Sequence, residues 1–201
     1  MKRDVVLAPG LWMPAAAMVL LAARLARHGY KTQVFAYWAR GPYEENVEAL
    51  ARFAGEKALF VGHSLGGVLL LDMLNRHPEI AAESVVLLGA PVRGCLAGRR
   101  FARARLGRWM MGACCPLWEE RRARWARGTP LGVVAGTLPV GLARTFGGVL
   151  PAPNDGVVCV EETTVEGMRA RALVRQGHSM LILSRRVGEL AAGFLAAGRF
   201  A

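Results

Sequence analysis

Short strand-like runs alternate with longer stretches of helical character along most of the chain. The runs lie at residues 5–8, 31–37, 58–62, 84–88, 132–136 and near 172–175. The stretches rich in helix formers lie at residues 15–27, 44–54, 65–76 and 183–197. This order predicts βαβ units and an α/β fold, in which helices cover both faces of a mainly parallel central sheet.

The alternation lapses between residues 93 and 128. This segment holds ten arginines, three tryptophans and no strand-like run. On a helical wheel one side of its first half carries apolar side chains, namely Ala102, Leu106, Trp109 and Met110. We expect a small Arg-rich cap, inserted into a single domain that spans residues 1–201.

Composition agrees with one globular domain. A chain of 201 residues with 53% hydrophobic residues is long and apolar enough to bury a sizeable core. With 20% charged residues, it does not resemble a disordered or collagen-like chain. The four cysteines are Cys95, Cys114, Cys115 and Cys159. None has the C-x-x-C spacing of a zinc site, so we expect reduced thiols in a cytoplasmic protein, and no metal or other cofactor.

The N-terminal residues imitate a secretory signal or membrane anchor. Lys2 and Arg3 precede an uncharged stretch at residues 5–23. Four residues break the pattern, namely Asp4, Pro9, Gly10 and Pro14. A strand, a tight loop and a helix therefore explain this segment better than an apolar span.

The net charge of the chain bears on the kind of partner it binds. The 26 Lys and Arg residues outnumber the 15 Asp and Glu residues, which gives a formal charge of +11. Such a balance favours an acidic partner, such as nucleic acid or an anionic membrane surface. Only three of the basic residues are lysines, and Arg, Ala and Gly abound together, as expected from GC-rich codons. Compositional drift is therefore an alternative source of the charge.

The most specific chemical motif is Gly-His-Ser-Leu-Gly at residues 62–66, followed by Gly67. It matches G-x-S-x-G, and a predicted strand and a predicted helix flank it, as a nucleophile elbow requires. A serine on so sharp a turn needs small neighbours, and the following helix directs N–H groups toward developing negative charge. Ser64 is the predicted nucleophile. A glycine-rich turn with an incidental serine is the alternative.

A serine nucleophile needs a base, and the base needs an acid to orient it. Of the four histidines, His178 lies just past the last predicted strand, in a loop that can reach the top of the sheet. Asp155 occupies a turn-rich loop between two late strands, and Glu161 and Glu162 farther along are alternatives. The order Ser64, Asp155, His178 is the one expected of an α/β-hydrolase.

An oxyanion intermediate needs two backbone N–H donors. The amide of Leu65, directly after the nucleophile, is the first predicted donor. We expect the second from the loop after the first strand, at residues 9–12, where Pro9 has no N–H to offer. The Leu11 amide is the preferred donor and the Trp12 amide the alternative. A simple strand-to-helix turn would give this loop no such role.

Nearly the whole chain resembles the α/β-hydrolase superfamily, in particular small bacterial lipase/esterase-like members related to the PGAP1-like group. The segments that carry the resemblance are the first strand with its loop, residues 62–67, residues 154–163 and residues 177–180. Relatives usually have His-Gly where this chain has Pro9-Gly10, so we expect the loop to differ in shape. The elbow is specific for the superfamily and specifies no substrate.

The resemblance implies a serine hydrolase that cleaves carboxylic esters through an acyl-enzyme, with Ser64, His178 and Asp155 as catalytic residues. The basic cap suggests an alternative, hydrolysis of an ester or thioester linked to an acidic acyl carrier protein. An anionic lipid surface would suit the cap equally, with peripheral attachment to a membrane. A non-catalytic binding module is a third hypothesis, but no nucleic-acid-binding motif accompanies the charge. A merely solvated cap is the simplest interpretation.

Overall fold

The computed structural model describes residues 3–141 and 148–200, so Lys2 lies outside the described residues. The strands of these residues form one sheet in the order β2-β1-β3-β4-β5-β6, and every neighbouring pair is parallel. They are β1 (Arg3–Ala8), β2 (Tyr30–Val34), β3 (Lys57–His63), β4 (Ala81–Leu88), β5 (Leu131–Gly136) and β6 (Ala170–Val174).

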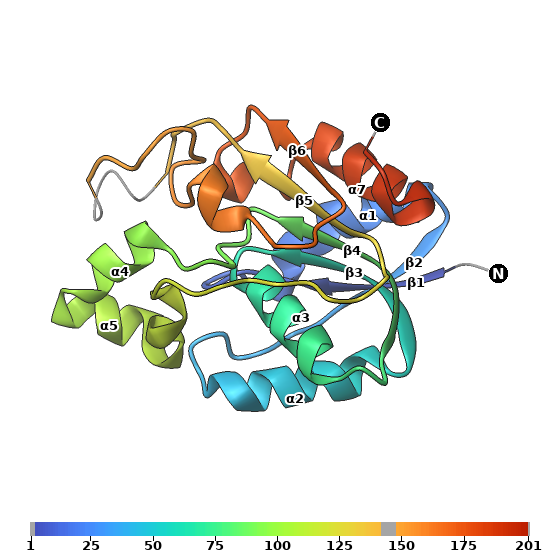
Figure 1. Ribbon diagram of the computed structural model, residues 1–201, viewed down its shortest axis with the longest axis horizontal. Helices are drawn as coiled ribbons and strands as arrows, with labels where there is room; N and C mark the ends of the chain where they lie inside the picture. Colours follow the sequence, from blue (N-terminus) through green and yellow to red (C-terminus); the bar gives the residue numbers. More distant parts are fainter. Residues whose placement is uncertain (1–2, 142–147, 201) are drawn as a thin grey trace.

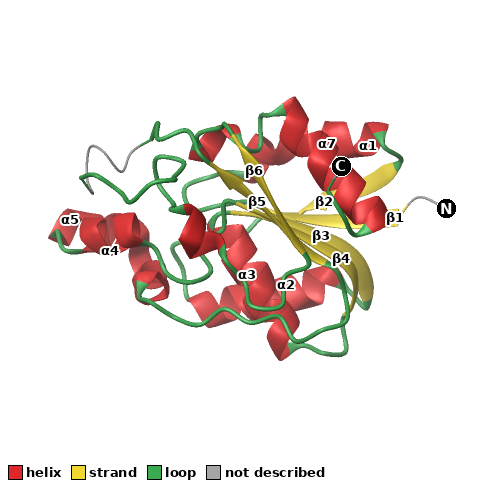
Figure 2. Ribbon diagram, turned by 45° about the horizontal axis from the view of Figure 1, so that its top comes forward, coloured by secondary structure: helices red, strands yellow, loops and turns green. Residues whose placement is uncertain are grey.

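Helices cover both faces of this sheet. Figure 1 and the turned view in Figure 2 place α1 (Val19–Arg27) and α7 (Arg185–Ala197) on one face, and α2 (Tyr43–Ala54) and α3 (Leu65–Arg76) on the other. Side chains alternate along the buried strands. On β1, Val5 and Leu7 belong to one core cluster, whereas Val6 and Ala8 belong to the other. The predicted fold class is confirmed.

The central helix α3 is apolar on nearly every side because it is buried between the sheet and its neighbours. It ends at Arg76, two residues before Pro78. The guanidinium of Arg127 then donates hydrogen bonds to three carbonyls at this end, those of Leu74, His77 and Ile80. A cation suits the negative end of a helix, so this arginine has a structural role.

Residues 93–128 begin with a helical hairpin instead of a strand. It consists of α4 (Leu96–Ala102) and α5 (Arg105–Met111), and a 3-10 helix follows at Gly112–Trp118. In Figure 1 the hairpin lies at the end of the sheet where β5 and β6 terminate. None of the helices within residues 3–141 and 148–200 has both the length and the hydropathy needed to cross a bilayer.

The helical wheel drawn for this segment is wrong. Leu106 and Trp109 are 63% and 66% exposed, and the buried residues of α5 are Gly107 and Met111. The cause is a break in the helix at Ala104, whose backbone is extended. The chain then turns back so closely that a Cβ on Gly107 would lie 2.0 Å from the Phe101 carbonyl oxygen. Only glycine permits that approach. With Gly107 packed against α4, Leu106 and Trp109 lie on the side of α5 that faces the solvent.

The boundaries of two elements near the site also differ from the prediction. The helix predicted from residue 15 starts as a 3-10 turn at Ala15–Met18 and becomes α-helical only at Val19. The strand predicted to reach residue 37 leaves the sheet after Val34, although the Phe35 amide still donates to the Leu7 carbonyl. Beyond it, the Tyr37 hydroxyl donates to the Pro9 carbonyl at 2.8 Å. The end of this segment therefore supports a loop instead of the sheet.

Candidate active site

The elbow of residues 62–66 joins the end of β3 to the start of α3. Ser64 has φ 53° and ψ −124°, a strained backbone conformation for a residue with a side chain. A Cβ on Gly62 would lie 2.6 Å from the Gly67 Cα, and one on Gly66 would lie 2.2 Å from the Ala8 carbonyl oxygen. The glycines of the motif are thus required by close backbone contacts on both sides of Ser64.

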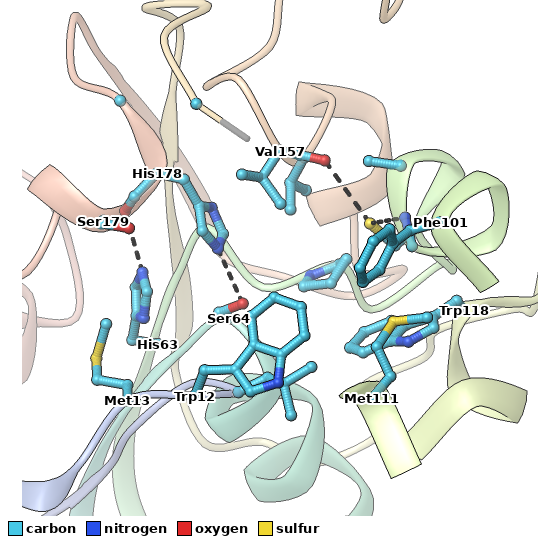
Figure 3. Close-up of a pocket in the computed structure, with 18 of the residues that line it drawn as sticks. Trp12, Met13, His63, Ser64, Phe101, Met111, Trp118, Val157, His178 and Ser179 are labelled. Atoms are coloured by element: carbon cyan, nitrogen blue, oxygen red, sulfur yellow. Dashed lines mark hydrogen bonds between the residues drawn. The ribbon is translucent and has the colours of Figure 1, made fainter. Parts of the chain in front are cut away.

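Ser64, His178 and Asp155 lie together at the carboxyl ends of the strands. The Ser64 Oγ and the His178 Nε2 are 2.9 Å apart, and Figure 3 shows this hydrogen bond. On the other side of the ring, the His178 Nδ1 lies 2.7 Å from the Asp155 Oδ2. Because a carboxylate only accepts hydrogen bonds, it holds the proton on Nδ1 and leaves the Nε2 lone pair facing the serine hydroxyl.

The Asp155 carboxylate is buried and fully engaged. Its Oδ1 accepts hydrogen bonds from the amides of Val157 and Val158, at 3.0 and 2.7 Å. The backbone of the histidine loop is tied to the same residue, because the His178 amide donates to the Asp155 carbonyl at 2.9 Å. Gly89, at φ 55°, leaves room for the pair, since its Cβ would lie 3.2 Å from the Asp155 Oδ2.

The alternative acids lie elsewhere. Glu161 is exposed, and Glu162 accepts hydrogen bonds from the amides of Leu96 and Cys159, at 2.6 and 2.7 Å. The Glu162 carboxylate thereby connects the first residue of α4 to the turn that follows the Asp155 loop. Burial raises its pKa, and these two hydrogen bonds oppose the rise. Of the three predicted acids, Asp155 is the one that faces His178.

His63, within the elbow, has a structural part that the sequence did not reveal. Its Nε2 lies 3.1 Å from the backbone carbonyl oxygen of His178 (Figure 3). The centres of the His63 and His178 rings are 4.9 Å apart. A carbonyl oxygen only accepts, so the proton of neutral His63 is on Nε2. The side chain is buried, and burial is the main cause that lowers the pKa of His63, to about 3. The nearby His178 is the second cause. His63 therefore anchors the backbone of His178 as a neutral donor.

This burial makes acid destabilising. The unfolded chain protonates His63 below its ordinary pKa of 6.5, whereas the folded chain resists protonation down to about pH 3, so stability falls as the pH falls through that window. Between pH 6.5 and 4.5 we expect His63 to lower the free energy of unfolding by about 2–3 kcal/mol. Urea denaturation across this range should show a steeper loss in wild type than in His63→Gln.

The Gln variant retains an N–H donor for the His178 carbonyl and does not titrate, which makes it the matched control. Equal slopes in the two proteins would contradict the assignment. Should the variant not fold, NMR of the His63 imidazole in wild type gives a direct answer. Its signals are expected to stay constant from pH 7 to 4.5.

The loop predicted to supply an oxyanion donor presses against the elbow. A Cβ on Gly10 would lie 2.9 Å from the Ser64 Cβ, so the two turns are in close contact. Trp12 has φ 59°, and its indole Nε1 donates to the Met110 carbonyl at 2.9 Å. Leu11 lines the pocket beside Ser64, and the Leu65 amide is the first N–H of α3, without an acceptor in its own helix. The roles of these amides as donors stay predictions.

A cavity of about 250 Å³ opens in front of Ser64. One wall comes from the segment that starts with the hairpin, and the other from the loops after β1, β5 and β6 (Figure 3). The apolar side chains that decide its shape include Trp12, Phe101, Met111, Trp118, Val157 and Met180. The walls thus offer an uncharged group apolar surface directly beside the serine hydroxyl.

The four cysteines are free, and none is suited to act as a nucleophile. Burial raises the pKa of Cys95, in the pocket wall, well above its usual range, and raises those of Cys114 and Cys159 to about 12. The half-buried Cys115 also has a raised pKa, for the same reason. At neutral pH these groups are thiols, and a thiol is a poor nucleophile. None of the four cysteines therefore competes with Ser64 as a nucleophile.

No protein-family model matches the sequence, and no curated protein matches it. Solved structures do match the fold. A mature lipase, BlEst2, from Bacillus licheniformis has a TM-score of 0.73 and 18% identity, over 99% of this chain and 93% of that one. A structure from a study of carboxylesterases of Nitrososphaera gargenis has a TM-score of 0.64 and 12% identity, over 98% and 91%.

The monoacylglycerol lipase of Paleococcus ferrophilus is also similar, with a TM-score of 0.59 and 14% identity, over 98% of this chain and 95% of the other. At such identities the likeness defines the fold, and the narrower PGAP1-like placement stays a prediction. The parallel sheet, the elbow after β3 and these structural neighbours all indicate the same fold. The chain has the α/β-hydrolase fold.

Proposed function

We propose that this protein is a serine hydrolase that cleaves carboxylic esters, of the esterase or lipase kind. The observation that carries the proposal is the hydrogen-bonded series from Ser64 through His178 to Asp155, at the base of an apolar pocket. The esterases and lipases among the structural neighbours support the same class of reaction.

In the first half of the reaction, the Ser64 Oγ attacks the carbonyl carbon of the ester while the His178 Nε2 takes its proton. The amides of Leu65 and Leu11 donate hydrogen bonds to the oxyanion. His178 then passes the proton to the departing alkoxide, which leaves as an alcohol. The acyl group remains bound to Ser64 as an ester.

In the second half, water replaces the alcohol. His178 removes a proton from water as it attacks the acyl-enzyme, and then returns the proton to the Ser64 Oγ, so that a carboxylic acid leaves. Asp155 stays ionised throughout and stabilises the imidazolium that forms twice in each cycle. The amides of Val157 and Val158 hold its carboxylate in place.

The pocket favours a substrate with a modest apolar group. Its volume of about 250 Å³ is below the range of roughly 300–1,000 Å³ that is typical of ligand pockets. We therefore expect p-nitrophenyl butyrate and octanoate to be cleaved faster than the palmitate. The test is a series of p-nitrophenyl esters of increasing acyl length, combined with a fluorophosphonate label located by mass spectrometry.

Labelling of Ser64 in folded protein, together with ester cleavage, is the expected outcome. A label that reacts only at other serines would contradict the proposal, even if slow ester cleavage were seen. Acyl-pantetheine thioesters test the carrier-protein alternative. That alternative requires them to be cleaved faster than a p-nitrophenyl ester of the same acyl group.

A further inference from the structure

The α4–α5 hairpin, residues 96–111, has an inner and an outer face. Phe101 and Met111 on the inner face line the pocket. On the outer face, Leu106 and Trp109 are the large exposed apolar residues. Both lie on α5, opposite the buried Gly107. A helix that covers a pocket on one side and exposes leucine and tryptophan on the other has an unpartnered apolar face.

The hairpin is strongly basic, with five arginines and no acidic residue in residues 96–111. Some arginines of the hairpin and beyond it have internal partners. Arg99 pairs with Glu120 at 2.9 Å, and Arg121 pairs with Asp72 at the same distance. By contrast, Arg103 and Arg105 are exposed and form no ion pair with the residues that the structure describes. Their charges are available to an external anion.

The basic and apolar side chains of α5 point outward together. In a helix, Arg105, Leu106 and Trp109 occupy one arc, away from Gly107. Arg108 lies in the same arc, but its guanidinium donates to the Ala102 carbonyl at 2.8 Å. Trp109 is further steadied by Arg40, whose guanidinium lies 4.9 Å from the centre of its ring. Arginine beside exposed leucine and tryptophan is the combination that binds the interface of an anionic bilayer, where aromatic and aliphatic groups enter and cations meet headgroups.

The hairpin is also attached to the mouth of the pocket. The Trp12 indole donates to the Met110 carbonyl, and the Trp12 and Phe101 rings meet edge to face at 6.1 Å. Two further residues that line the pocket are largely exposed, Val140 at 66% and Met180 at 50%. A surface that covered α5 would therefore lie beside the pocket opening.

We propose that the outer face of the α4–α5 hairpin docks on an anionic phospholipid surface and holds the pocket beside the bilayer. Charge complementarity supports an anionic partner. The exposed Leu106 beside Trp109 favours a bilayer over double-stranded nucleic acid, whose phosphates would be bound by the arginines. The proposal concerns binding. It is tested in the Ser64→Ala protein, so that its outcome does not depend on the proposed hydrolysis.

The experiment measures sedimentation of Ser64→Ala protein with vesicles of phosphatidylglycerol and phosphatidylcholine in equal parts, and with phosphatidylcholine alone. We expect binding to the anionic vesicles that weakens as salt is raised, and little binding to the neutral ones. Each basic residue near an anionic bilayer strengthens binding about fivefold. Arg103→Gln with Arg105→Gln should therefore weaken binding about 25-fold.

Matched variants distinguish binding by the outer face of the hairpin from attraction by the net positive charge of the protein. Arg52→Gln with Arg124→Gln removes the same charge from exposed residues outside the hairpin, and is expected to change binding little. Leu106→Ser should weaken binding about tenfold, because it removes an apolar side chain from the interface. Its control is Leu20→Ser, at an exposed leucine on α1, with no expected effect. Circular dichroism confirms that each variant is folded.

Three results would overturn the proposal. The first is failure of the folded protein to bind anionic vesicles at low salt. The second is an equal loss of binding in the hairpin pair and in the Arg52 and Arg124 pair, which would show attraction by net charge alone. The third is unchanged binding in Leu106→Ser together with equally tight binding to double-stranded DNA. That result would identify a general polyanion surface.

Discussion

Replacement of Ser64 by alanine is expected to lower kcat for p-nitrophenyl butyrate by about 10⁶-fold. The variant removes the oxygen that we propose forms the acyl-enzyme, while His178 and Asp155 remain hydrogen-bonded to each other. Some acceleration over water should persist, because the amides of Leu65 and Leu11, the proposed oxyanion donors, do not depend on the hydroxyl. Initial rates at saturating ester, measured for both proteins, give the ratio.

Alanine keeps the Cβ that contacts Gly10 and the strained backbone at residue 64, so the fold is expected to survive. Urea denaturation checks this directly. The sharper control is fluorophosphonate, which should label wild type and leave Ser64→Ala unlabelled. A folded variant that retains more than a small fraction of the activity would show that hydrolysis takes place elsewhere on the protein.

The second large effect is expected from Asp155→Asn, which should lower kcat by about 10⁴-fold. Asparagine has one accepting oxygen, whereas Asp155 accepts from two directions, the His178 ring on one side and the amides of Val157 and Val158 on the other. If the oxygen faces the two amides, the NH₂ group faces the His178 Nδ1. The ring then carries its proton on Nε2 and cannot take the proton of Ser64.

The opposite orientation of the amide is disfavoured, because it places NH₂ against two backbone N–H groups in a buried site. We therefore expect the unproductive tautomer to predominate, with little change in KM. Nitrogen NMR of labelled His178 distinguishes the two ring nitrogens and should show the proton moved to Nε2. A variant with normal kcat, or with the proton still on Nδ1, would contradict the assigned role of Asp155.

Much of this architecture was accessible from local pattern. The elbow, the flanking strand and helix, and the loop with His178 each depend on neighbouring residues, and parallel strands bring their carboxyl ends to one edge. Asp155, and not Glu162, is hydrogen-bonded to the His178 ring. These two residues are 23 apart in the chain, so their order along the sequence indicates such a contact but does not define it.

What escaped prediction depends on contacts that periodicity does not encode. The orientation of α5 follows from the close approach of Gly107 to the Phe101 carbonyl, and a helical wheel that treats residues 102–110 as one helix misses it. The anchoring part of His63 depends on the His178 carbonyl, 115 residues away. The internal partners of Arg121 and Arg127 were equally hidden, because composition counts charges without saying which of them face inward.

The Glu162 carboxylate determines which parts of the hairpin can be exchanged without loss of its attachment to the rest of the protein. The Glu162 carboxylate accepts hydrogen bonds from the amides of Leu96, at the start of α4, and Cys159, in the turn after the Asp155 loop. One side chain therefore attaches the hairpin to that loop. A replacement hairpin that placed proline, which has no N–H, at residue 96 would lose this link. Exchange confined to residues 99–118 keeps both hydrogen bonds of Glu162, so the covering over the pocket can be diversified while this attachment stays in place.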